Sequence, residues 1–370
     1  MAQGVTPTGI TNTTRVEATT HRKIHAKVVD NVLSSRTYWA RLNGMGKSFT
    51  GKTFDIPIKV TDSGEGEFYT GLETLNSAAS DTVIELSYAH TGFAQPVVSI
   101  LLESFANSGP EQAISLDQFK LDEAVGEATQ KLGTAAFSTG TGDQPMGLGG
   151  QVDDGTDVAT IGGQSRTTFS VLDSTRTASG GTLSLSKLAT LHSAVSAAGI
   201  ESEEPNIGVT TKTVWDLYEQ LLSPQVRASY ASVGFDALPV RASTSAGAVR
   251  RSELKGASGF TALSYRGIPI IKDDAATAQN LFLLNEKYLF WAGRTSVPEK
   301  YRGQLEAVNL GTPSTTEGVM AAPTGSHGWF FQKLQMMPNQ AGMIGRYHVV
   351  GQIIGTQPRR QGRLTGITGV

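Results

Sequence analysis

Apolar residues recur at helical spacing between Ser115 and Phe137, and this periodicity predicts one long amphipathic helix over residues 115–137. Ser115, followed three residues later by Gln118, has the form of a capping box, in which each side chain bonds a free amide of the first turn. Gly126 and Gly133 each cost roughly 1 kcal/mol relative to Ala inside a helix, so packing must hold this helix together. Its predicted apolar face consists of Leu116, Phe119, Ala124, Val125, Ala128, Leu132, Ala135 and Ala136, with Glu127 and Lys131 paired on the opposite side.

Two stretches before this helix alternate between apolar and polar residues, which is typical of β-strands. They cover residues 53–60 and 82–90, and the segment between them is rich in Gly, Ser and acidic residues, including Gly64-Glu65-Gly66-Glu67. The pattern predicts a two-stranded ribbon with a long tip. Such a ribbon is only marginally stable alone, so we expect it to lie on another surface. The apolar positions are Phe54, Ile56, Ile58 and Val60 in the first strand, and Ile84, Leu86 and Tyr88 in the second.

The rest of the chain predicts shorter elements separated by glycine-rich loops. Residues 1–20 are polar and have no periodicity, which predicts an extended arm that needs a neighbour to become ordered. Residues 21–34 predict a short amphipathic helix, and residues 357–370, with Arg359, Arg360 and Arg363 among glycines, predict a loose tail. Further helices are predicted at 184–198 and 213–222, strands at 206–210, 265–274, 281–289, 329–337 and 343–354, and loops with short strands at 150–185.

The long helix and the loop after it resemble a known family. The helix ends in Ala135-Ala136-Phe137, and Gly140-Thr141-Gly142-Asp143-Gln144-Pro145-Met146-Gly147-Leu148 follows. This stretch is similar to the spine helix and following loop of tailed-bacteriophage major capsid proteins, whose fold we call the Hong Kong-type capsid fold. The ribbon stands where that family has its extended loop, and residues 265–274 and 281–289 resemble its axial domain. By order of elements the resemblance covers roughly residues 45–300.

The resemblance implies an α+β fold with an N-terminal arm, an extended β-hairpin loop, a peripheral domain that contains the spine helix, and an axial domain. The expected division along the chain is the arm and short helix at 1–50, the extended loop at 51–95, the peripheral domain at 96–150 with the spine helix at 115–137, the axial domain at 151–300, and return strands of the peripheral domain with a C-terminal tail at 301–370.

Composition narrows the function. The chain has 370 residues, of which 17% are charged, with a net charge of −2 and 42 glycines. A dedicated nucleic-acid binder would carry concentrated basic charge, so this class is disfavoured. The absence of cysteine excludes disulfides, thiolate metal sites and a cysteine nucleophile. No apolar run is long enough to span a membrane, and the N-terminus has neither a signal core nor a long charged leader, so we expect no membrane partner and a separate scaffold protein.

The stretch most similar to a known active-site motif is Gly44-Met45-Gly46-Lys47-Ser48, whose last three residues match the end of a phosphate-binding loop. Arg41 stands where the first glycine of that motif belongs, and no apolar strand precedes it. The backbone amides therefore cannot form the anion cradle that such loops provide.

The candidate metal ligands also lack the spacing of known metal-binding motifs. His21 and His25 lack a third ligand, and we interpret them as solvated residues. Asp153, Asp154 and Asp157 lack the pattern of a calcium-binding loop, and we interpret them as a solvated turn. His192 lies off the apolar stripe of its helix and is expected to be solvated or satisfied. We therefore expect no catalytic residue, no cofactor and no metal, and predict that the protein is not an enzyme.

The resemblance implies a major capsid protein that self-assembles into pentamers and hexamers of an icosahedral phage head around double-stranded DNA. The implied location is the virion, after assembly and procapsid maturation in the host cytoplasm. The implied partners are further copies of the chain, scaffolding, portal and decoration proteins, and packaged DNA held only non-specifically. Three alternatives stay open: an encapsulin-like nanocompartment shell, a soluble α/β enzyme with an unrecognised site, and a phage tail or decoration protein.

Candidate inter-subunit contacts follow from charge and from the resemblance. Glu65 and Glu67 at the ribbon tip are expected to meet Arg15, Arg22, Lys23 or Lys27 of another subunit. Some members of the family join a lysine of the extended loop to an asparagine of a neighbour, which makes Lys52, Lys59 and Asn339 candidates. That reaction needs a lysine made neutral by burial and a nearby carboxylate, and no motif places such a carboxylate.

Overall fold

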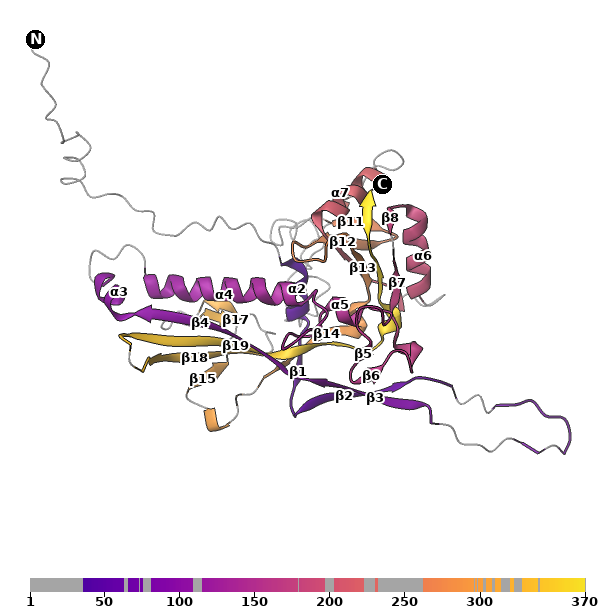
Figure 1. The fold of residues 1–370 in the computed structure, drawn as a ribbon, viewed down its shortest axis with the longest axis horizontal. Coiled ribbons are helices and arrows are strands. Elements are labelled where there is room, and N and C mark those ends of the chain that lie inside the picture. The colour runs from indigo at the N-terminus through magenta and orange to yellow at the C-terminus, as the bar shows by residue number, and fades with distance from the viewer. Residues whose placement is uncertain are drawn as a thin grey trace, which may run out of the picture.

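The structure, a computed structural model, describes residues 36–62, 66–72, 74–75, 81–108, 115–178, 180–196, 203–222, 230–231, 262–295, 297, 299–301, 304–307, 310–313, 320–322, 328–338 and 340–369. These residues form an elongated part built from one long helix on a sheet, a second part in which shorter helices pack on another sheet, and a ribbon that projects from the junction between the two (Figure 1). The predicted arm at 1–20 and the short helix at 21–34 lie outside the described residues.

The predicted long helix is α4, Leu116–Ala135. The Ser115 hydroxyl accepts a hydrogen bond from the Gln118 amide at 3.4 Å, as predicted. The Gln118 side chain does not complete the capping box but donates to Asp122 instead, at 3.2 Å. The helix buries Ala124, Ala128, Leu132 and Gly133.

The loop after α4 turns back tightly against the end of the helix. Leu148 donates its backbone N–H to the Ala136 carbonyl at 2.7 Å. A Cβ atom on Gly147 would lie 2.4 Å from the Ala135 carbonyl oxygen, so only glycine fits this close approach. Gly147, one of the glycines in the stretch that carries the family resemblance, therefore has a packing reason. The turn leads into the short buried helix α5, Leu148–Gln151, which the sequence did not predict.

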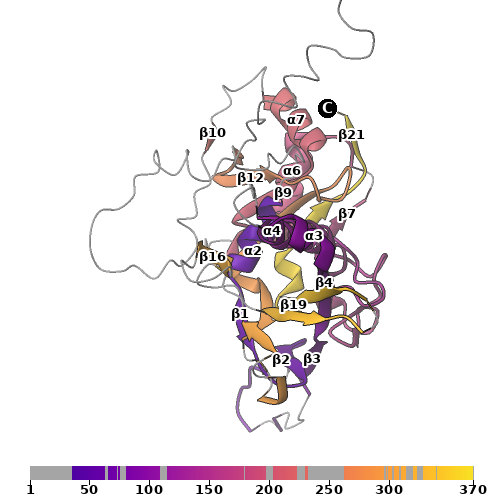
Figure 2. The same ribbon diagram turned by 90° about the vertical axis from the view of Figure 1, so that its left-hand side faces the viewer.

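One face of α4 packs on a six-stranded sheet with the order β1-β14-β19-β18-β15, in which β4 also pairs with β19 (Figures 1 and 2). Its inner face places Phe331 beside Tyr347 at the core beneath the helix. The predicted strands at 329–337 and 343–354 are confirmed as β18 and β19. The bounds are β1 Lys47–Phe49, β4 Thr91–Ile100, β14 Leu289–Arg294, β15 Leu305–Ala307, β18 Trp329–Met336 and β19 Gly342–Gly355.

The charged pair on α4 also faces this sheet. Gln95 of β4 donates to Glu127 and accepts a hydrogen bond from Lys131 at 3.3 Å. Glu127 and Lys131 were predicted to lie opposite the packed face, but both bond the nearly buried side-chain amide of Gln95 in the sheet.

The second sheet has seven strands in the order β10-β11-β12-β9-β13-β20-β7. Helices α6, Leu185–Val195, and α7, Lys212–Leu222, contribute Leu188, Leu191, Trp215 and Tyr218 to the core on this sheet. The bounds are β7 Thr175–Thr177, β9 Ile207–Thr210, β10 Tyr230–Ala231, β11 Ala262–Tyr265, β12 Ile268–Lys272, β13 Leu281–Leu284 and β20 Gly362–Leu364.

The prediction of a loose tail over 357–370 is wrong. Strand β20 pairs with both β13 and β7, inside the second sheet. Gly362 allows this close packing, since a Cβ atom there would lie 2.7 Å from Val195 of α6. Arg363 is only 3% exposed and is neutralised by Asp153 and Asp157. The strand β21, Ile367–Gly369, then pairs with β8, Gly181–Thr182.

The remaining elements are short. They are the helices α2 Thr37–Gly44 and α3 Leu101–Ala106, the 3-10 turns η1 Ser170–Leu172, η4 Glu286–Tyr288, η5 Glu299–Tyr301 and η6 Pro358–Arg360, and the strands β5 Thr160–Ile161, β6 Gln164–Ser165, β16 Leu310–Pro313 and β17 Met320–Ala322. The strand β14 follows β13 closely along the chain, yet it belongs to the sheet under α4.

Candidate assembly surfaces

The predicted ribbon consists of β2, Thr53–Lys59, and β3, Val83–Ala89, paired antiparallel with Ile56 opposite Leu86. The apolar residues that the alternation placed on one face pack against the body at the base of the ribbon. Leu86 and Tyr88 are buried there in a cluster with Phe290 and Ile354. The base of the ribbon is therefore an integral part of the fold.

Two hydrogen bonds clamp β3 to the β5–β6 hairpin. Ser87 donates its amide to the Gly162 carbonyl at 2.9 Å, and the Gln164 side chain donates to the Glu85 carbonyl at 3.0 Å. The Tyr88 hydroxyl donates to the Gly355 carbonyl at 3.1 Å, and burial raises the pKa of this phenol. These contacts hold the direction of the ribbon from its base up to Glu85.

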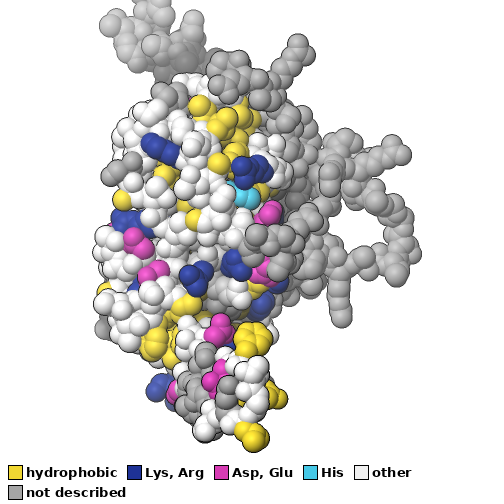
Figure 3. Space-filling view, turned by 90° about the vertical axis from the view of Figure 1, so that its right-hand side faces the viewer, with side chains coloured by type: hydrophobic (Ala, Val, Ile, Leu, Met, Phe, Trp, Pro, Cys, Tyr) yellow, Lys and Arg dark blue, Asp and Glu magenta, His cyan; other side chains and the backbone are white. Residues whose placement is uncertain are grey.

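The far part of the ribbon carries large apolar side chains that are exposed to solvent. Phe68 is 106% exposed and Leu72 is 108% exposed, which means that the described part of the chain covers neither side chain. Tyr69, Leu75 and Val83 are also exposed. Figure 3 looks at the molecule from the ribbon side and shows apolar side chains gathered on the ribbon. We call residues 66–75 the ribbon tip. Exposed large apolar groups in such a cluster mark an interaction site.

A second exposed apolar patch lies at the opposite end of the molecule, at α3 and the neighbouring strand ends (Figure 1). It consists of Val98, Ile100, Leu102, Phe105 and Met336. The two patches thus lie at the two ends of the long axis, which suits contacts with more than one neighbour.

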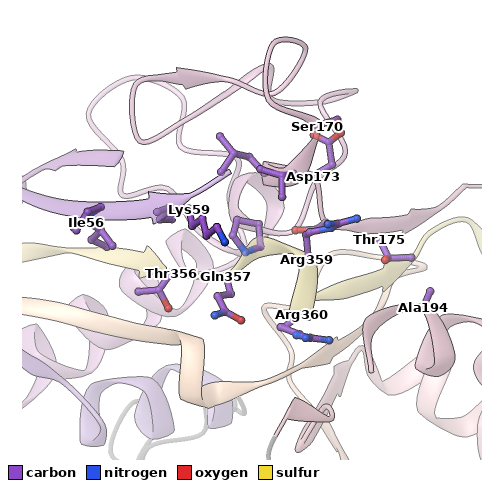
Figure 4. A pocket seen from close by; sticks show the side chains of 16 residues that line it. Ile56, Lys59, Ser170, Asp173, Thr175, Ala194, Thr356, Gln357, Arg359 and Arg360 are labelled. Atoms are coloured by element: carbon purple, nitrogen blue, oxygen red, sulfur yellow. The ribbon is translucent and has the colours of Figure 1, made fainter. Parts of the chain in front are cut away.

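A cleft of about 770 Å³ opens where the ribbon meets the body. Figure 4 shows Lys59 of the ribbon, Asp173 next to η1 and Arg359 of η6 around it. Burial raises the pKa of the Asp173 carboxyl, although the charge of Arg166 opposes this shift. Among the described residues that line the cleft, Asp173 is the one carboxylate, and histidine is absent.

The acidic turn at 153–157 proves to be structural. The Asp153 side chain is 0% exposed, accepts hydrogen bonds from the amides of Gly155, Asp157 and Val158, and contacts Arg363. Arg176 lies 3.3 Å from Asp157 and 3.5 Å from Asp154. The solvated-turn interpretation is therefore wrong for Asp153, because arginines from β7 and β20 neutralise the turn.

Arg166 lies beside this turn and binds backbone carbonyls. Its guanidinium donates to the carbonyls of Gly150 at 2.7 Å and Leu172 at 3.2 Å, and to that of Asp153. It therefore satisfies carbonyls at the end of the short helix α5.

The predicted contact residues are partly described. Lys52 and Glu67 are exposed, and Glu67 lies in the ribbon tip beside Phe68. Lys59 is exposed and forms an ion pair with Asp62. Arg15, Arg22, Lys23, Lys27, Glu65 and Asn339 lie outside the described residues. Sequence reasoning missed the apolar tip itself, although four large apolar residues within a Gly- and acid-rich segment carried that signal: Phe68, Tyr69, Leu72 and Leu75.

The Gly44–Ser48 motif has the reverse of phosphate-loop order. Helix α2 ends at Gly44 and strand β1 begins at Lys47, whereas a phosphate-binding loop leads from a strand into a helix. The Lys47 ammonium lies 3.8 Å from the centroid of the Phe290 ring, so it contacts an aromatic face.

His192 is nearly buried, and its ring nitrogen Nδ1 lies 3.3 Å from the Ser196 hydroxyl and 3.4 Å from Arg266. Burial, together with the Arg266 charge, lowers the pKa of its imidazole. Among the residues that the structure describes, no cluster of three acidic or histidine side chains could hold a metal, and no helix is long and apolar enough to cross a membrane.

No protein-family model matches the chain, and no curated protein matches its sequence. Solved structures do match. The cyanophage A-1(L) capsid asymmetric unit superposes with a TM-score of 0.66 at 14% identity, covering 94% of this chain and 97% of that one. The SrpI encapsulin from Synechococcus elongatus gives 0.60 at 10% identity, covering 97% and 96%. The capsid of a native GTA particle gives 0.55 at 12% identity, covering 95% and 99%.

The chain has the Hong Kong-type capsid fold. The similarity extends over nearly all of the chain and of its neighbours, so it includes the ribbon, α4 and both sheets. The predicted α+β class and the predicted resemblance are thereby confirmed. The same fold thus occurs in a phage capsid and in an encapsulin.

Proposed function

We propose that this chain is a phage major capsid protein, which assembles into pentamers and hexamers of an icosahedral head around double-stranded DNA. Its partners are further copies of itself, with scaffolding, portal and decoration proteins, and the DNA is enclosed without being specifically bound. Its place is the virion, reached after assembly and procapsid maturation in the host cytoplasm. The predicted division into arm, extended loop, peripheral domain and axial domain belongs to this proposal.

The proposal rests on the contrast between the buried base of the ribbon and its exposed tip. The base is buried and clamped, whereas Phe68 and Leu72 at the tip are fully exposed. Burying a large apolar side chain stabilises by about 1.5–3 kcal/mol, and this stabilisation is available only from another molecule. A capsid fold with such a ribbon indicates a protein whose tip packs on a second copy.

Charge supports the same arrangement. We propose that Glu65 and Glu67, the first just before the ribbon tip and the second within it, meet Arg15, Arg22, Lys23 or Lys27 of a neighbour. Exposed ion pairs weaken with salt, so reversing the charge of both glutamates should lower assembly most at low ionic strength. Assembly that is unchanged at every salt concentration would contradict this contact.

A covalent link through Lys52 or Lys59 to Asn339 remains a testable proposal. The exposed ammonium of Lys59 lies against Asp62, so burial within the single chain does not supply the neutral lysine that the reaction needs. A ladder of multimers in denaturing gels of intact particles would demonstrate the link, and a single monomer band would exclude it.

The encapsulin match favours a second candidate, a nanocompartment shell that encloses proteins. The two functions differ in their contents. Electron microscopy of the expressed chain should show closed particles in either case. Nuclease-protected DNA of genome length inside particles from the natural source would support the capsid, and co-purifying enclosed protein without DNA would support the compartment. Discrete small oligomers at all concentrations would contradict both.

A further inference from the structure

The cleft between the ribbon and the body gathers positive charge. Lys59 of β2 lines it from the ribbon, and Arg359 and Arg360 of η6 line it from the body (Figure 4). Three cations against the single carboxylate of Asp173 leave a net charge of +2 among the described lining residues, whereas the whole chain has a net charge of −2. A cleft that concentrates one sign of charge attracts ligands of the other sign, which here are anions.

The two arginines have donors left for a ligand. They belong to the turn η6, which joins β19 to β20 and is anchored by the buried Pro358. Arg359 is exposed and forms no hydrogen bond or ion pair with the described residues, and its charge reaches Asp173 only at longer range. Arg360 lies 3.6 Å from Glu203, which is too far for a hydrogen bond. Guanidinium groups in this state can bind the oxygens of a phosphate in pairs.

Asp173 is the one group in the cleft that repels an anion, and its surroundings favour the neutral form. Its Oδ1 atom is buried and has no hydrogen-bond partner among the described residues. An unpaired buried polar atom costs about 1–3 kcal/mol. Burial also raises the pKa of this carboxyl, so it takes up a proton more readily than an ordinary aspartate. A protonated carboxyl can donate a hydrogen bond to an anion, which would satisfy this side chain.

The size and the walls of the cleft limit what it can hold. Its volume of about 770 Å³ lies within the range of small-molecule sites, which is roughly 300–1,000 Å³. Hydroxyl groups add further donors to the cations, and they come from Ser170, Thr175 and Thr356. Several cations and hydroxyls around one space match a compact ligand with several negative charges better than a single carboxylate.

We propose that this cleft binds a small oligophosphate, with Arg359 and Arg360 on its phosphate oxygens and Lys59 reaching it from the ribbon. The recognised chemistry is a run of linked phosphates, either inorganic or attached to a nucleoside. Because the ribbon supplies the lysine and the body supplies the arginines, the bound anion links the two parts. This inference is independent of the shell function, since a single chain contains the whole cleft.

The test is isothermal titration calorimetry of the full chain with inorganic tripolyphosphate, followed by the same titration with ATP. Saturable binding of one tripolyphosphate per chain, weakened by added salt, is the expected result. ATP that binds more tightly than tripolyphosphate would identify a nucleotide as the ligand, because Ile56, Ile58 and Val171 offer an apolar wall to its base. Equal binding would identify the phosphate chain alone as the recognised group.

Two double variants that remove the same charge separate a site from general attraction. Lys59→Gln with Arg359→Gln should weaken tripolyphosphate binding by about tenfold or more, a change of at least ~1.4 kcal/mol. Lys52→Gln with Lys300→Gln is the matched control, since both lysines are exposed and neither lines the cleft, and it should weaken binding by less than about twofold. Asp173→Asn should bind several times more tightly at neutral pH, because it removes the repelling charge.

Urea unfolding of each variant checks that it folds. Equal weakening by the two double variants, or weaker binding by Asp173→Asn, would overturn the assignment of the cleft. If the cleft variants do not fold, the wild-type titration decides, because the absence of saturable binding at low salt overturns the proposal by itself. Shell-forming chains that do not bind tripolyphosphate would contradict the cleft alone, and chains that bind it without forming shells would contradict the shell function alone.

Discussion

The guanidinium of Arg363 in β20 contacts the carboxylate of Asp153, a residue 210 positions earlier in the chain, and both side chains are buried. This pair ties the C-terminal strand to the turn that Arg166 holds beside the ribbon base. The ribbon and the second sheet therefore share one buried polar junction.

Arg363→Met should destabilise the unassembled subunit by about 3–5 kcal/mol, because removing one partner leaves a buried carboxylate without its main counter-charge. Urea unfolding measures this loss. The matched control is Arg360→Met, since Arg360 is partly exposed and lies 3.6 Å from Glu203, and it should cost less than about 1 kcal/mol. Equal effects of the two substitutions would show that β20 does not hold Arg363 in a buried pair.

The two glycines of α4 should respond differently to alanine. Gly126→Ala should raise the free energy of unfolding by roughly 0.5–1 kcal/mol, because nothing lies within 4 Å of the added Cβ atom and alanine favours helix. Gly133→Ala should give no gain, because the added atom would lie 2.4 Å from the Arg36 side chain, which would have to move. Thermal unfolding of both variants checks this, and a gain at Gly133 equal to that at Gly126 would contradict the packing of Arg36 on the helix.

The pH dependence of the free energy of unfolding should show the cost of ionising Asp173 in the folded protein. Burial raises the pKa of this carboxyl above its ordinary value of 3.8, so its stabilising contribution is present in acid and is lost as the pH rises through the folded-state pKa. Asp173→Asn should therefore unfold at higher urea concentration than the wild type at pH 7, a gain that should shrink as the pH falls toward 4.

Asp154→Asn is the control of opposite sign. Burial alone would raise the pKa of Asp154, but hydrogen bonds from Thr156 and the charge of Arg176 lower it. Its contribution is present above the ordinary pKa and is lost in acid, so the variant should be less stable than the wild type at neutral pH and equal to it in acid. Parallel profiles for the two variants would contradict these assignments.

The sequence predicted elements whose pattern lies within one segment. Helix α4 and strands β2 and β3 were predictable because their periodicity is local and their apolar faces are continuous. Asp153 and Arg363 were misinterpreted because each looks solvated in its own segment, and only the fold brings them together. Helix α5 was missed because Leu148-Gly149-Gly150-Gln151 has no periodicity, and its burial depends on the return of the chain against α4.

The site was less predictable than the fold. Charge led to Glu67 in the ribbon tip, but the apolar cluster at the ribbon base combines β1, β3, β14 and β19, and no single segment of the chain contains it. The apolar tip residues were visible in the sequence, yet their exposure depends on where the clamp at Gly162 directs the ribbon.

The last prediction separates folding from assembly within the ribbon. Phe68→Ser with Leu72→Ser should leave the unfolding of the single subunit unchanged, because both side chains are fully exposed and contribute no burial to it. The same variant should form few or no particles, because the apolar area that the tip offers to a neighbour is lost. Leu86→Ala is the matched change at the base, where the side chain is 0% exposed, and it should cost the subunit about 2–5 kcal/mol. Urea unfolding and electron microscopy of both variants give the two readouts. A tip variant that assembles normally would remove the central support for the shell function, because the bare residues of the ribbon would then have no partner to explain them.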